Sequence, residues 1–269
     1  MTEQQDDSSD DSDIDFDTDM FAEPEGFRPS TPPPVSESFE RDASHVLPGQ
    51  PSTIDLQMIG GRDSLWAHKI WNGGVVLAKH IDKNKERVVG KRVLELGAAA
   101  ALPSLISALN GAECVVATDY PEPRLISTIK RNCLVNCPTQ VSQGTLKVVP
   151  HQWGQDLTEV LTSLPDDTRK FDVIYLADLI FNHTEHRALL KTCLGALQPG
   201  KESCLYVYFS HHNVHWADKD MKFFEIAQEV EFGFTVEKID AVRAEAMFPD
   251  DTGDIDVRTT VHCYKMQRE

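Results

Sequence analysis

The sequence predicts an α/β protein built on a mostly parallel, doubly wound sheet, and three observations support this fold class. Short apolar runs that suit strands buried on both faces alternate with helical patterns along most of the chain. A glycine, Gly97, directly follows the first of these runs and permits a tight turn. A carboxylate, Asp119, ends the next run at about the 20-residue spacing that holds a nucleotide ribose.

Length and charge define the expected domain. The 269 residues are 41% hydrophobic, which is enough for the core of one α/β domain. The first 25 residues hold eleven of the 43 acidic side chains and no Lys or Arg. Because residues 1–45 are acidic and rich in Ser and Pro, we predict a disordered tail there and a folded domain over 46–269.

Composition also bears on partners and location. The domain is mildly acidic and shows no basic stripe, which argues against nucleic acid and favours a basic protein or an amine as partner. The six cysteines form no C-x-x-C pair, and several of them lie in apolar strands or helix faces, where a free thiol acts as a small hydrophobe. With no visible signal peptide or membrane-length apolar run, we predict a cytoplasmic protein that does not bind a membrane. A monomer is the default expectation.

The elements around the glycine turn follow from local patterns. Alternating apolar residues over 54–58 suggest an edge strand or a hairpin arm. Helical spacing from Trp71 to Ile81 predicts a short amphipathic helix. The first buried strand covers 93–96, and Pro103 stands where the first turn of the next helix should begin.

The rest of the chain continues the alternation. A helix should follow Pro121-Glu122-Pro123, and the apolar residues of 189–197 predict another. A third helix is predicted over 216–230. Strands are predicted over 115–119, 146–150, 171–178 and 204–209, with two closing strands at 232–236 and 257–264.

Four of these strands end in residues that suit a nucleoside ligand. Gly97, Asp119, Trp153 and Asp178 each follow or end a strand, and a parallel sheet brings such ends to one edge. Trp153 could cover an adenine ring or simply anchor its loop. The dinucleotide pattern G-x-G-x-x-G is not met, because Ala99 and Leu102 replace its second and third glycines.

Five motifs occur in a specific order along the chain. They are Trp71-Asn72-Gly73-Gly74, Glu95-Leu96-Gly97 through Leu102-Pro103-Ser104, Thr118-Asp119-Tyr120-Pro121, Trp153-Gly154, and Ala177-Asp178-Leu179-Ile180-Phe181-Asn182-His183. Together they resemble the seven-strand lysine methyltransferase-like group, and in particular its elongation factor methyltransferase branch, earlier classed with nicotinamide N-methyltransferases. The tail segment over 23–34 fits the same branch, so the resemblance covers most of 23–264.

The resemblance implies a Rossmann-like seven-strand fold and S-adenosyl-L-methionine as methyl donor. It also implies trimethylation of the N-terminal glycine of elongation factor 1-alpha and methylation of the adjacent lysine. The positions that match the family's donor contacts are Trp71, Gly97, Ala98, Ala99, Asp119, Trp153 and Ala177. Ala99 and Ala101 depart from the family's glycines, and their methyl groups narrow the approach to a ligand and disfavour positive φ.

Asp178 and Phe181 match the D-x-x-F/Y motif that follows the fourth strand of the family. Asp178 is the candidate hydrogen-bond acceptor that positions the amine, with a role in merely pinning its loop as the alternative. Phe181 would line the methyl channel and face the cationic sulfonium, or else pack in the core.

Three hypotheses stay open on these residues. The first is a protein N-terminal and lysine methyltransferase. The second is a small-amine, nicotinamide-like N-methyltransferase on the same fold. The third is a cofactor-binding interaction module that has lost turnover. His183 and the cluster His211-His212-x-x-His215 lack a carboxylate or cysteine partner at ligand spacing, so we expect loop histidines and no metal.

Overall fold

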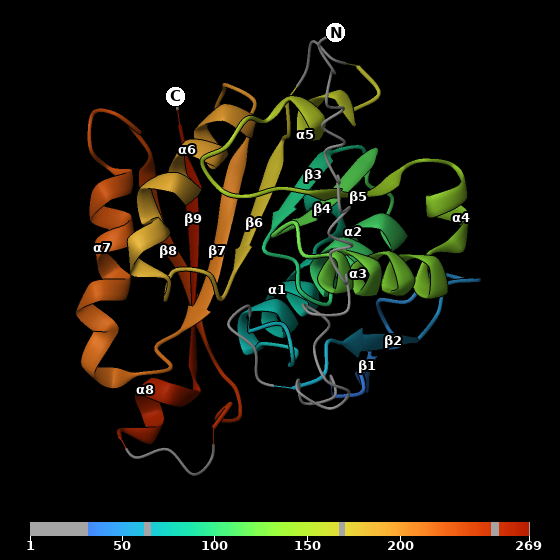
Figure 1. The fold of residues 1–269 in the computed structure, drawn as a ribbon, viewed down its shortest axis with the longest axis horizontal. Helices are drawn as coiled ribbons and strands as arrows, with labels where there is room; N and C mark the ends of the chain where they lie inside the picture. Colours follow the sequence, from blue (N-terminus) through green and yellow to red (C-terminus); the bar gives the residue numbers. More distant parts are fainter. Residues whose placement is uncertain (1–31, 62–65, 167–169, 249–252, 269) are drawn as a thin grey trace, which may run out of the picture. The chain divides into compact units, whose positions relative to one another are not determined.

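The computed structural model describes residues 32–61, 66–166, 170–248 and 253–268 (Figure 1). The chain divides into Met1–Pro32 and Pro33–Glu269, and the fold belongs to the second of these units. Its centre is a seven-stranded sheet in the order β5-β4-β3-β6-β7-β9-β8. These strands are β3 (Arg92–Leu96), β4 (Cys114–Asp119), β5 (Leu146–Pro150), β6 (Val173–Ala177), β7 (Cys204–Ser210), β8 (Thr235–Arg243) and β9 (Thr260–Gln267).

Strands β5, β4, β3, β6 and β7 are parallel, and β9 runs antiparallel to both of its neighbours. The prediction of a mostly parallel, doubly wound seven-strand sheet is therefore confirmed. The chain moves outward from β3 to β4 and β5, and then returns to add β6 on the other side of β3. This reversal of strand order lies between β3 and β6, where α/β sheets open a crevice at their carboxyl ends.

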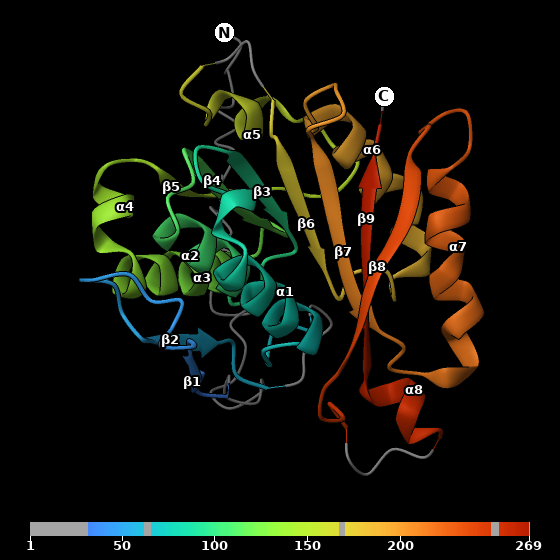
Figure 2. The same ribbon diagram turned by 180° about the vertical axis from the view of Figure 1, so that it is seen from behind.

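Helices cover both faces of the sheet (Figures 1 and 2). One apolar core contains side chains of α1 (Asn72–Lys83), α2 (Leu102–Leu109) and α3 (Pro123–Asn136), and the other contains those of α5 (Thr158–Thr162), α6 (His186–Ala196) and α7 (Ala217–Ala227). Along β3 the side chains alternate between the two cores, since Val93 belongs to the first and Leu94 and Leu96 to the second. The strand is therefore fully buried, as its apolar sequence predicts.

The remaining helical elements of the described residues are short. They are α4 (Pro138–Ser142), α8 (Ile255–Thr259) and the 3₁₀-helices η2 (Lys85–Arg87), η3 (His183–Glu185) and η4 (Val214–Trp216). None of the described helices has the length and apolar character that a membrane crossing needs. All six cysteines are free and buried, whereas the sequence predicted apolar surroundings for several of them.

A two-stranded hairpin, β1 (Val35–Glu40) with β2 (Thr53–Met58), packs beside α3. Two asparagines one helical turn apart on α3 form hydrogen bonds with the backbone of β2, along the edge that does not pair with β1. The amide of Asn136 accepts from Asp55 N at 2.8 Å and donates to Asp55 O at 2.9 Å. Asn132 does the same with Gln57, at 2.9 and 2.8 Å. The edge strand is thus closed by side chains instead of a further strand.

The predicted boundary at residue 45 is wrong, because β1 lies inside the predicted tail. Only one side chain of β1, Phe39, is buried, so this strand is held by backbone pairing and lacks an apolar pattern. Arg41 then forms a buried ion pair with Asp82 of α1, with nitrogen–oxygen distances of 3.0 and 2.7 Å. The folded unit therefore includes these residues. Residues 1–31 of the predicted tail lie outside the described residues.

Candidate active site

The turn after β3 has a strained backbone. Gly97 has a φ of +62°, and a Cβ there would lie 2.5 Å from a methyl carbon of Leu179 and 3.3 Å from the ring of Trp153. Ala99 and Ala101 have φ values of 47° and 61°, a conformation that costs a residue with a Cβ about 1 kcal/mol. These two alanines occupy the glycine-like conformation that their positions in the motif indicate.

Glu95, on β3, forms hydrogen bonds with the helix that follows this turn. Its side chain is buried, and Oε2 accepts hydrogen bonds from the backbone N and the Oγ of Ser104 at 2.9 and 2.5 Å. Ser104 lies in the first turn of α2, so this bond satisfies an N–H group that the helix itself leaves free. Burial raises the pKa of Glu95 to about 8. The carboxyl group therefore links the end of β3 to the start of α2.

Asp119 is the last residue of β4 and is half-buried. Its Oδ2 accepts from Ala99 N at 2.7 Å, and its Oδ1 accepts from Tyr120 N at 2.7 Å. Burial raises its pKa to about 6, although both backbone hydrogen bonds act in the opposite direction. A carboxylate has about four acceptor positions, so the side that faces the cavity can still receive donors such as ribose hydroxyls.

Asp178 directly follows β6 and has a positive φ of 52°. Its carboxylate is 1% exposed and accepts three hydrogen bonds: from Gly73 N at 2.5 Å, Ser210 N at 3.0 Å and His212 Nε2 at 3.1 Å. Gly73 lies in the first turn of α1, so Asp178 caps that helix from the end of β6. A Cβ on Gly73 would lie 2.6 Å from Oδ2 of Asp178 and 2.5 Å from Tyr208 O.

Trp153 reaches the same edge from the loop after β5. The next residue, Gly154, has a φ of +78° and donates its N–H to Thr192 Oγ1 of α6 at 2.8 Å. A Cβ at Gly154 would lie 3.0 Å from Cβ of Ala188. The loop is therefore held tightly against α6, which fixes the position of the indole.

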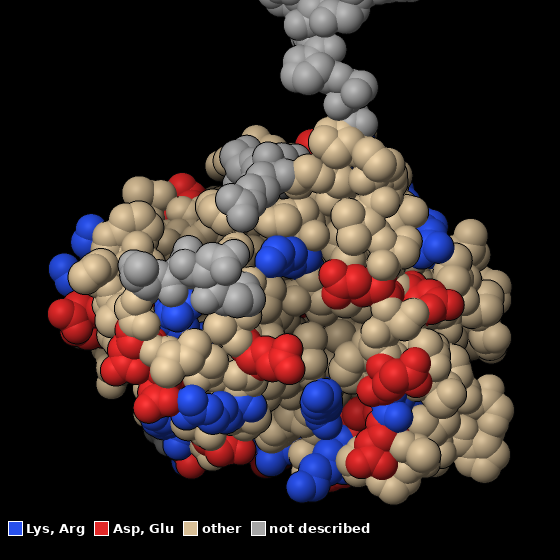
Figure 3. All heavy atoms as spheres, turned by 90° about the horizontal axis from the view of Figure 1, so that it is seen from below, with Lys and Arg blue, Asp and Glu red and all other residues tan. Residues whose placement is uncertain are grey.

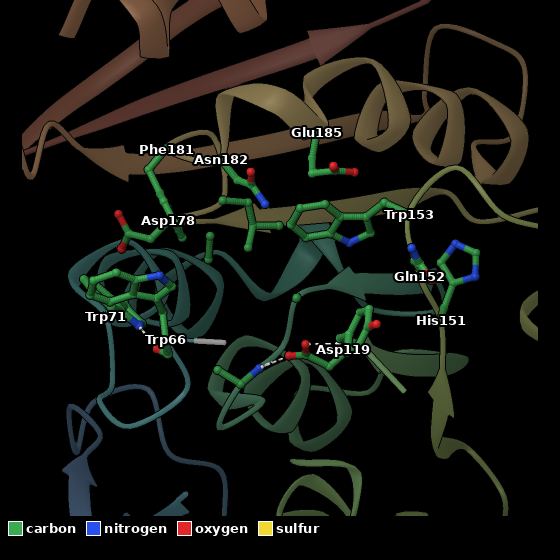
Figure 4. A pocket seen from close by; sticks show the side chains of 15 residues that line it. Trp66, Trp71, Asp119, His151, Gln152, Trp153, Asp178, Phe181, Asn182 and Glu185 are labelled. Carbon is green, nitrogen blue, oxygen red and sulfur yellow. Dashed lines mark hydrogen bonds between the residues drawn. The ribbon is translucent and has the colours of Figure 1, made fainter. Parts of the chain in front are cut away.

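These groups surround a cavity of about 490 Å³ (Figure 4). Figure 4 shows Trp66 and Trp71 on one side of it, Trp153 on the other and Asp119 below. The cavity is lined by all the sequence-predicted site residues except Ala98, namely Trp71, Gly97, Ala99, Asp119, Trp153, Ala177, Asp178 and Phe181. Ala98 instead lines a small adjoining cavity of about 30 Å³ and donates its N–H to Thr118 O at 2.9 Å.

Sequence reasoning missed part of the lining: Trp66, Tyr120, His151, Gln152, Leu179, Asn182 and Glu185. Most of these residues are neighbours of predicted ones, since Tyr120 follows Asp119 and Gln152 precedes Trp153. Proximity to a strand end could therefore have identified them. Trp66 has no such signal, because it precedes the first helix and reaches the cavity only through tertiary packing.

A second cavity, of about 320 Å³, adjoins the first. The two share Trp66, Trp71 and Phe181, and Phe181 is 37% exposed between them. The other lining residues of the second cavity are His212, Asn213, Trp216, Asp220 and Phe248. Phe181 therefore lies where the sequence places it, beside the ligand crevice, and on the wall of both cavities.

Two of the predicted loop histidines do have a carboxylate partner, which lies 37 residues from His183 and nine residues from His211. His183 Nε2 and His211 Nδ1 each lie 2.7 Å from an oxygen of Asp220 on α7. Within the described residues, no group of His, Cys, Asp and Glu side chains is arranged to hold a metal ion. Asp220 thus joins the end of β7, η3 and α7 through hydrogen bonds.

Known structures share this architecture. A Streptococcus mutans protein described as a SAM-dependent methyltransferase aligns over 80% of this chain and 53% of its own, with a TM-score of 0.53 and 14% identity. TYW2 of P. horikoshii, solved in complex with MeSAdo, aligns over 80% and 70%, with a TM-score of 0.50 and 13% identity. The fold is therefore that of S-adenosylmethionine-dependent methyltransferases. The sequence predicted the same methyl donor.

The sequence comparisons define the family. The lysine methyltransferase family profile matches residues 52–230, and the chain belongs to this family. The protein N-terminal and lysine N-methyltransferase efm7 of Schizosaccharomyces pombe is 45% identical over 92% of this chain and 94% of its own. The protein of the same name from Candida albicans is 37% identical over 93% and 95%. The chain is thus a methyltransferase.

Proposed function

We propose that this protein transfers methyl groups from S-adenosyl-L-methionine to the N-terminal glycine of elongation factor 1-alpha, up to the trimethylated state, and to the adjacent lysine. The observation that carries the proposal is the cavity at the carboxyl ends of β3, β4, β5 and β6, which the family motifs line. The relatives' printed names, protein N-terminal and lysine N-methyltransferase, support the choice of acceptor.

The cavity fits the donor in size and chemistry. Its volume of about 490 Å³ lies within the range of small-molecule sites, roughly 300–1,000 Å³. Asp119 would accept the ribose hydroxyls, Trp153 would cover the adenine, and the turn from Gly97 to Ala99 with Trp71 and Ala177 would enclose the remainder. When bound, the donor supplies an electrophilic methyl group on a sulfonium, and Phe181 would face that positive charge.

The acceptor amine must be neutral to attack the methyl group. At pH 7 an α-amino group is roughly one-tenth neutral, whereas a lysine side chain is below about a thousandth. The N-terminal amine is therefore the easier first substrate. Three protein donors occupy the Asp178 carboxylate, and we assign its remaining acceptor position to an N–H of the amine. Placement of the nucleophile supplies much of the rate in such an in-line displacement.

The test is methyl transfer from labelled donor to purified elongation factor 1-alpha, followed by mass spectrometry of its N-terminal peptide. We expect label on the N-terminal glycine and on the adjacent lysine. A matched substrate with an acetylated N-terminus should lose the glycine label. In a parallel reaction that contains nicotinamide, label on nicotinamide alone would favour the small-amine hypothesis. Donor binding without transfer to any protein of a whole-cell extract would favour the interaction module. Cytoplasmic location and a monomeric state stay predictions from sequence.

A further inference from the structure

The second cavity has walls of a kind that the donor cavity does not require. Of its eight described lining residues, five are Trp or Phe: Trp66, Trp71, Phe181, Trp216 and Phe248. Trp216 and Phe248 line only this cavity, whereas the other three also line the donor cavity. The aromatic chamber, as we call it, therefore begins where the methyl group would be transferred and extends away from the donor.

The rings of the aromatic chamber are steeply inclined to one another. Trp66 lies 6.2 Å from Trp71 at 64° and 6.2 Å from Phe181 at 75°, measured between ring centroids and ring planes. Trp71 lies 5.9 Å from Phe248 at 63°. Rings inclined in this way present faces in several directions around one space, as in the aromatic cages that bind quaternary ammonium groups.

The charge of the aromatic chamber also suits a cation. Asp220, which is 4% exposed, is part of the wall, and none of the described lining residues is Lys or Arg. Lys69 Nζ lies 4.8 Å from the centroid of Phe248, and Lys219 Nζ lies 5.6 Å from that of Trp216. Neither lysine is among the lining residues, although each places a positive charge beside one of the rings. Figure 3, viewed from the side toward which the parallel strands point, shows acidic and basic side chains interspersed on this face.

The hydrogen bonds of the aromatic chamber distinguish a methylated from an unmethylated amine. Both oxygens of Asp220 already accept from histidines, His183 and His211, at 2.7 Å. His212 is likewise engaged with Asp178. An ammonium with three N–H groups therefore finds only the acceptor positions that remain on Asp220, which is almost fully buried, and on Asn213. An N–H group left unpaired is costly in a desolvated site. A trimethylammonium has no N–H group and needs only ring faces and negative charge.

We propose that the aromatic chamber is a cage for the methylated ammonium group of the product, and that it retains the chain end between successive methyl transfers. This inference rests on the proposed function, because it takes the acceptor to be a protein amine. It adds a ligand preference: affinity should rise as methyl groups are added, and the fully methylated N-terminus should bind most tightly.

The test uses three forms of the tripeptide Gly-Lys-Gly, titrated by NMR into the full chain saturated with S-adenosylhomocysteine. The first has a free N-terminus, and the second has a trimethylated N-terminal glycine. In the third, 3,3-dimethylbutanoyl replaces trimethylglycyl, which keeps the shape and removes the charge. We expect the trimethylated peptide to bind at least about fivefold more tightly than either of the others. Equal Kd values for the charged and neutral isosteres would overturn the cage.

Variants at Phe248 provide a matched pair, because this residue lines only the aromatic chamber. Phe248→Tyr keeps a ring and should keep the preference for the charged isostere. Phe248→Leu keeps an apolar side chain without a ring and should reduce that preference to near unity. Trp216→Leu, at a half-exposed position, serves as a second variant should Phe248→Leu fail to fold. An unchanged preference in the folded leucine variants would refute the cage.

Two further measurements separate this inference from the proposed function. Affinity for S-adenosylhomocysteine should be the same in wild type and in both Phe248 variants, since this residue does not line the donor cavity. If the wild type methylates elongation factor 1-alpha but shows no preference for the trimethylated peptide, the cage fails and the proposed function stands. If the preference is present but no protein is methylated, the proposed function fails instead.

Discussion

Two carboxylates lie at the ends of the strands on either side of β3, and they differ in what they bind. Asp119 is half-buried and bonds the backbone of its own neighbour Tyr120 and of Ala99 in the adjacent turn. Asp178 is almost fully buried and bonds Gly73, Ser210 and His212, which are between 32 and 105 residues away. One carboxylate leaves part of its surface to the cavity, while the other joins three segments. A strand-end acid is therefore not enough to assign a role; its partners decide it.

Asp178→Ala should give the largest effect on stability. It leaves two buried N–H groups and a histidine without their acceptor, so we expect the free energy of unfolding to fall by about 3–5 kcal/mol. Asp119→Ala should cost less than about 1 kcal/mol, because water in the cavity can reach the N–H groups it frees. Urea unfolding of both variants measures the difference. Equal losses would break the comparison between the two sites.

A second matched pair refines the same result. Gly73→Ala pushes a methyl group against the Asp178 carboxylate, whereas Gly74, the next residue of α1, has open space around its Cβ position. We expect Gly73→Ala to destabilise the fold and to reduce turnover, and Gly74→Ala to leave the stability unchanged or slightly raised. Similar unfolding curves for the two variants would show that the cap on α1 matters little.

Donor affinity should show the opposite ranking. Asp119→Ala removes the only predicted acceptor of the ribose hydroxyls, and hydrogen bonds to a charged group contribute about 1.5–3 kcal/mol each. We therefore expect donor binding to fall by roughly 100-fold or more, to below detection by calorimetry. Asp178→Ala, if folded, should still bind the donor but turn over slowly. Unchanged donor affinity in Asp119→Ala would remove this residue from the site.

The pKa of Asp119 gives a smaller effect that depends on pH. Its folded-state pKa of about 6 lies above the ordinary value, so the folded protein binds this proton more tightly than the unfolded chain does. The free energy of unfolding is therefore higher at low pH, and this extra stability is lost as pH rises from about 4 to about 6. Ribose hydroxyls need the ionised form as acceptor. Donor affinity should therefore be about tenfold weaker at pH 5 than at pH 7.

Asp119→Asn is the control for this pH profile, because the amide keeps an acceptor oxygen and does not titrate. Its donor affinity should be nearly flat between pH 5 and 7, measured by calorimetry at each pH. Glu95, whose pKa is about 8, titrates mainly above this range. A profile in Asp119→Asn as steep as that of the wild type would assign the pH dependence to another group.

The sequence identified the elements whose signals are local. The apolar run of β3, Gly97 and Pro103 predicted a strand, a turn and a helix start, and all three are present. It failed for β1, since a polar edge strand depends on its partner β2 and on Asn132 and Asn136 beyond it. It also placed a closing strand over 232–236, whereas β8 covers Thr235–Arg243 with mostly exposed side chains.

The same division applies to the cavities. Residues at strand ends could be predicted because the parallel sheet alone brings their positions together. Trp66, Trp216, Phe248 and Asp220 come from other segments, and nothing in their local sequence indicates that they meet. The aromatic chamber is therefore a product of tertiary packing, while the donor cavity follows largely from the strand pattern.

The smallest effect that we predict tests the strained turn that holds Asp119. The backbone N–H of Ala99 donates to the Asp119 carboxylate, and Ala99 has a φ of 47°. Its neighbour Ala98 is buried but does not have a positive φ. Ala99→Gly relieves about 1 kcal/mol of strain, which offsets most of the added entropy of the unfolded chain, so its unfolding free energy should change by less than about 0.5 kcal/mol. Ala98→Gly has no strain to relieve and should cost about 1 kcal/mol or more. Thermal and urea unfolding of the two variants measure the difference. If both glycine variants lose the same stability, the left-handed turn at Ala99 carries no strain, and the alanines of this motif are as well suited to it as glycine.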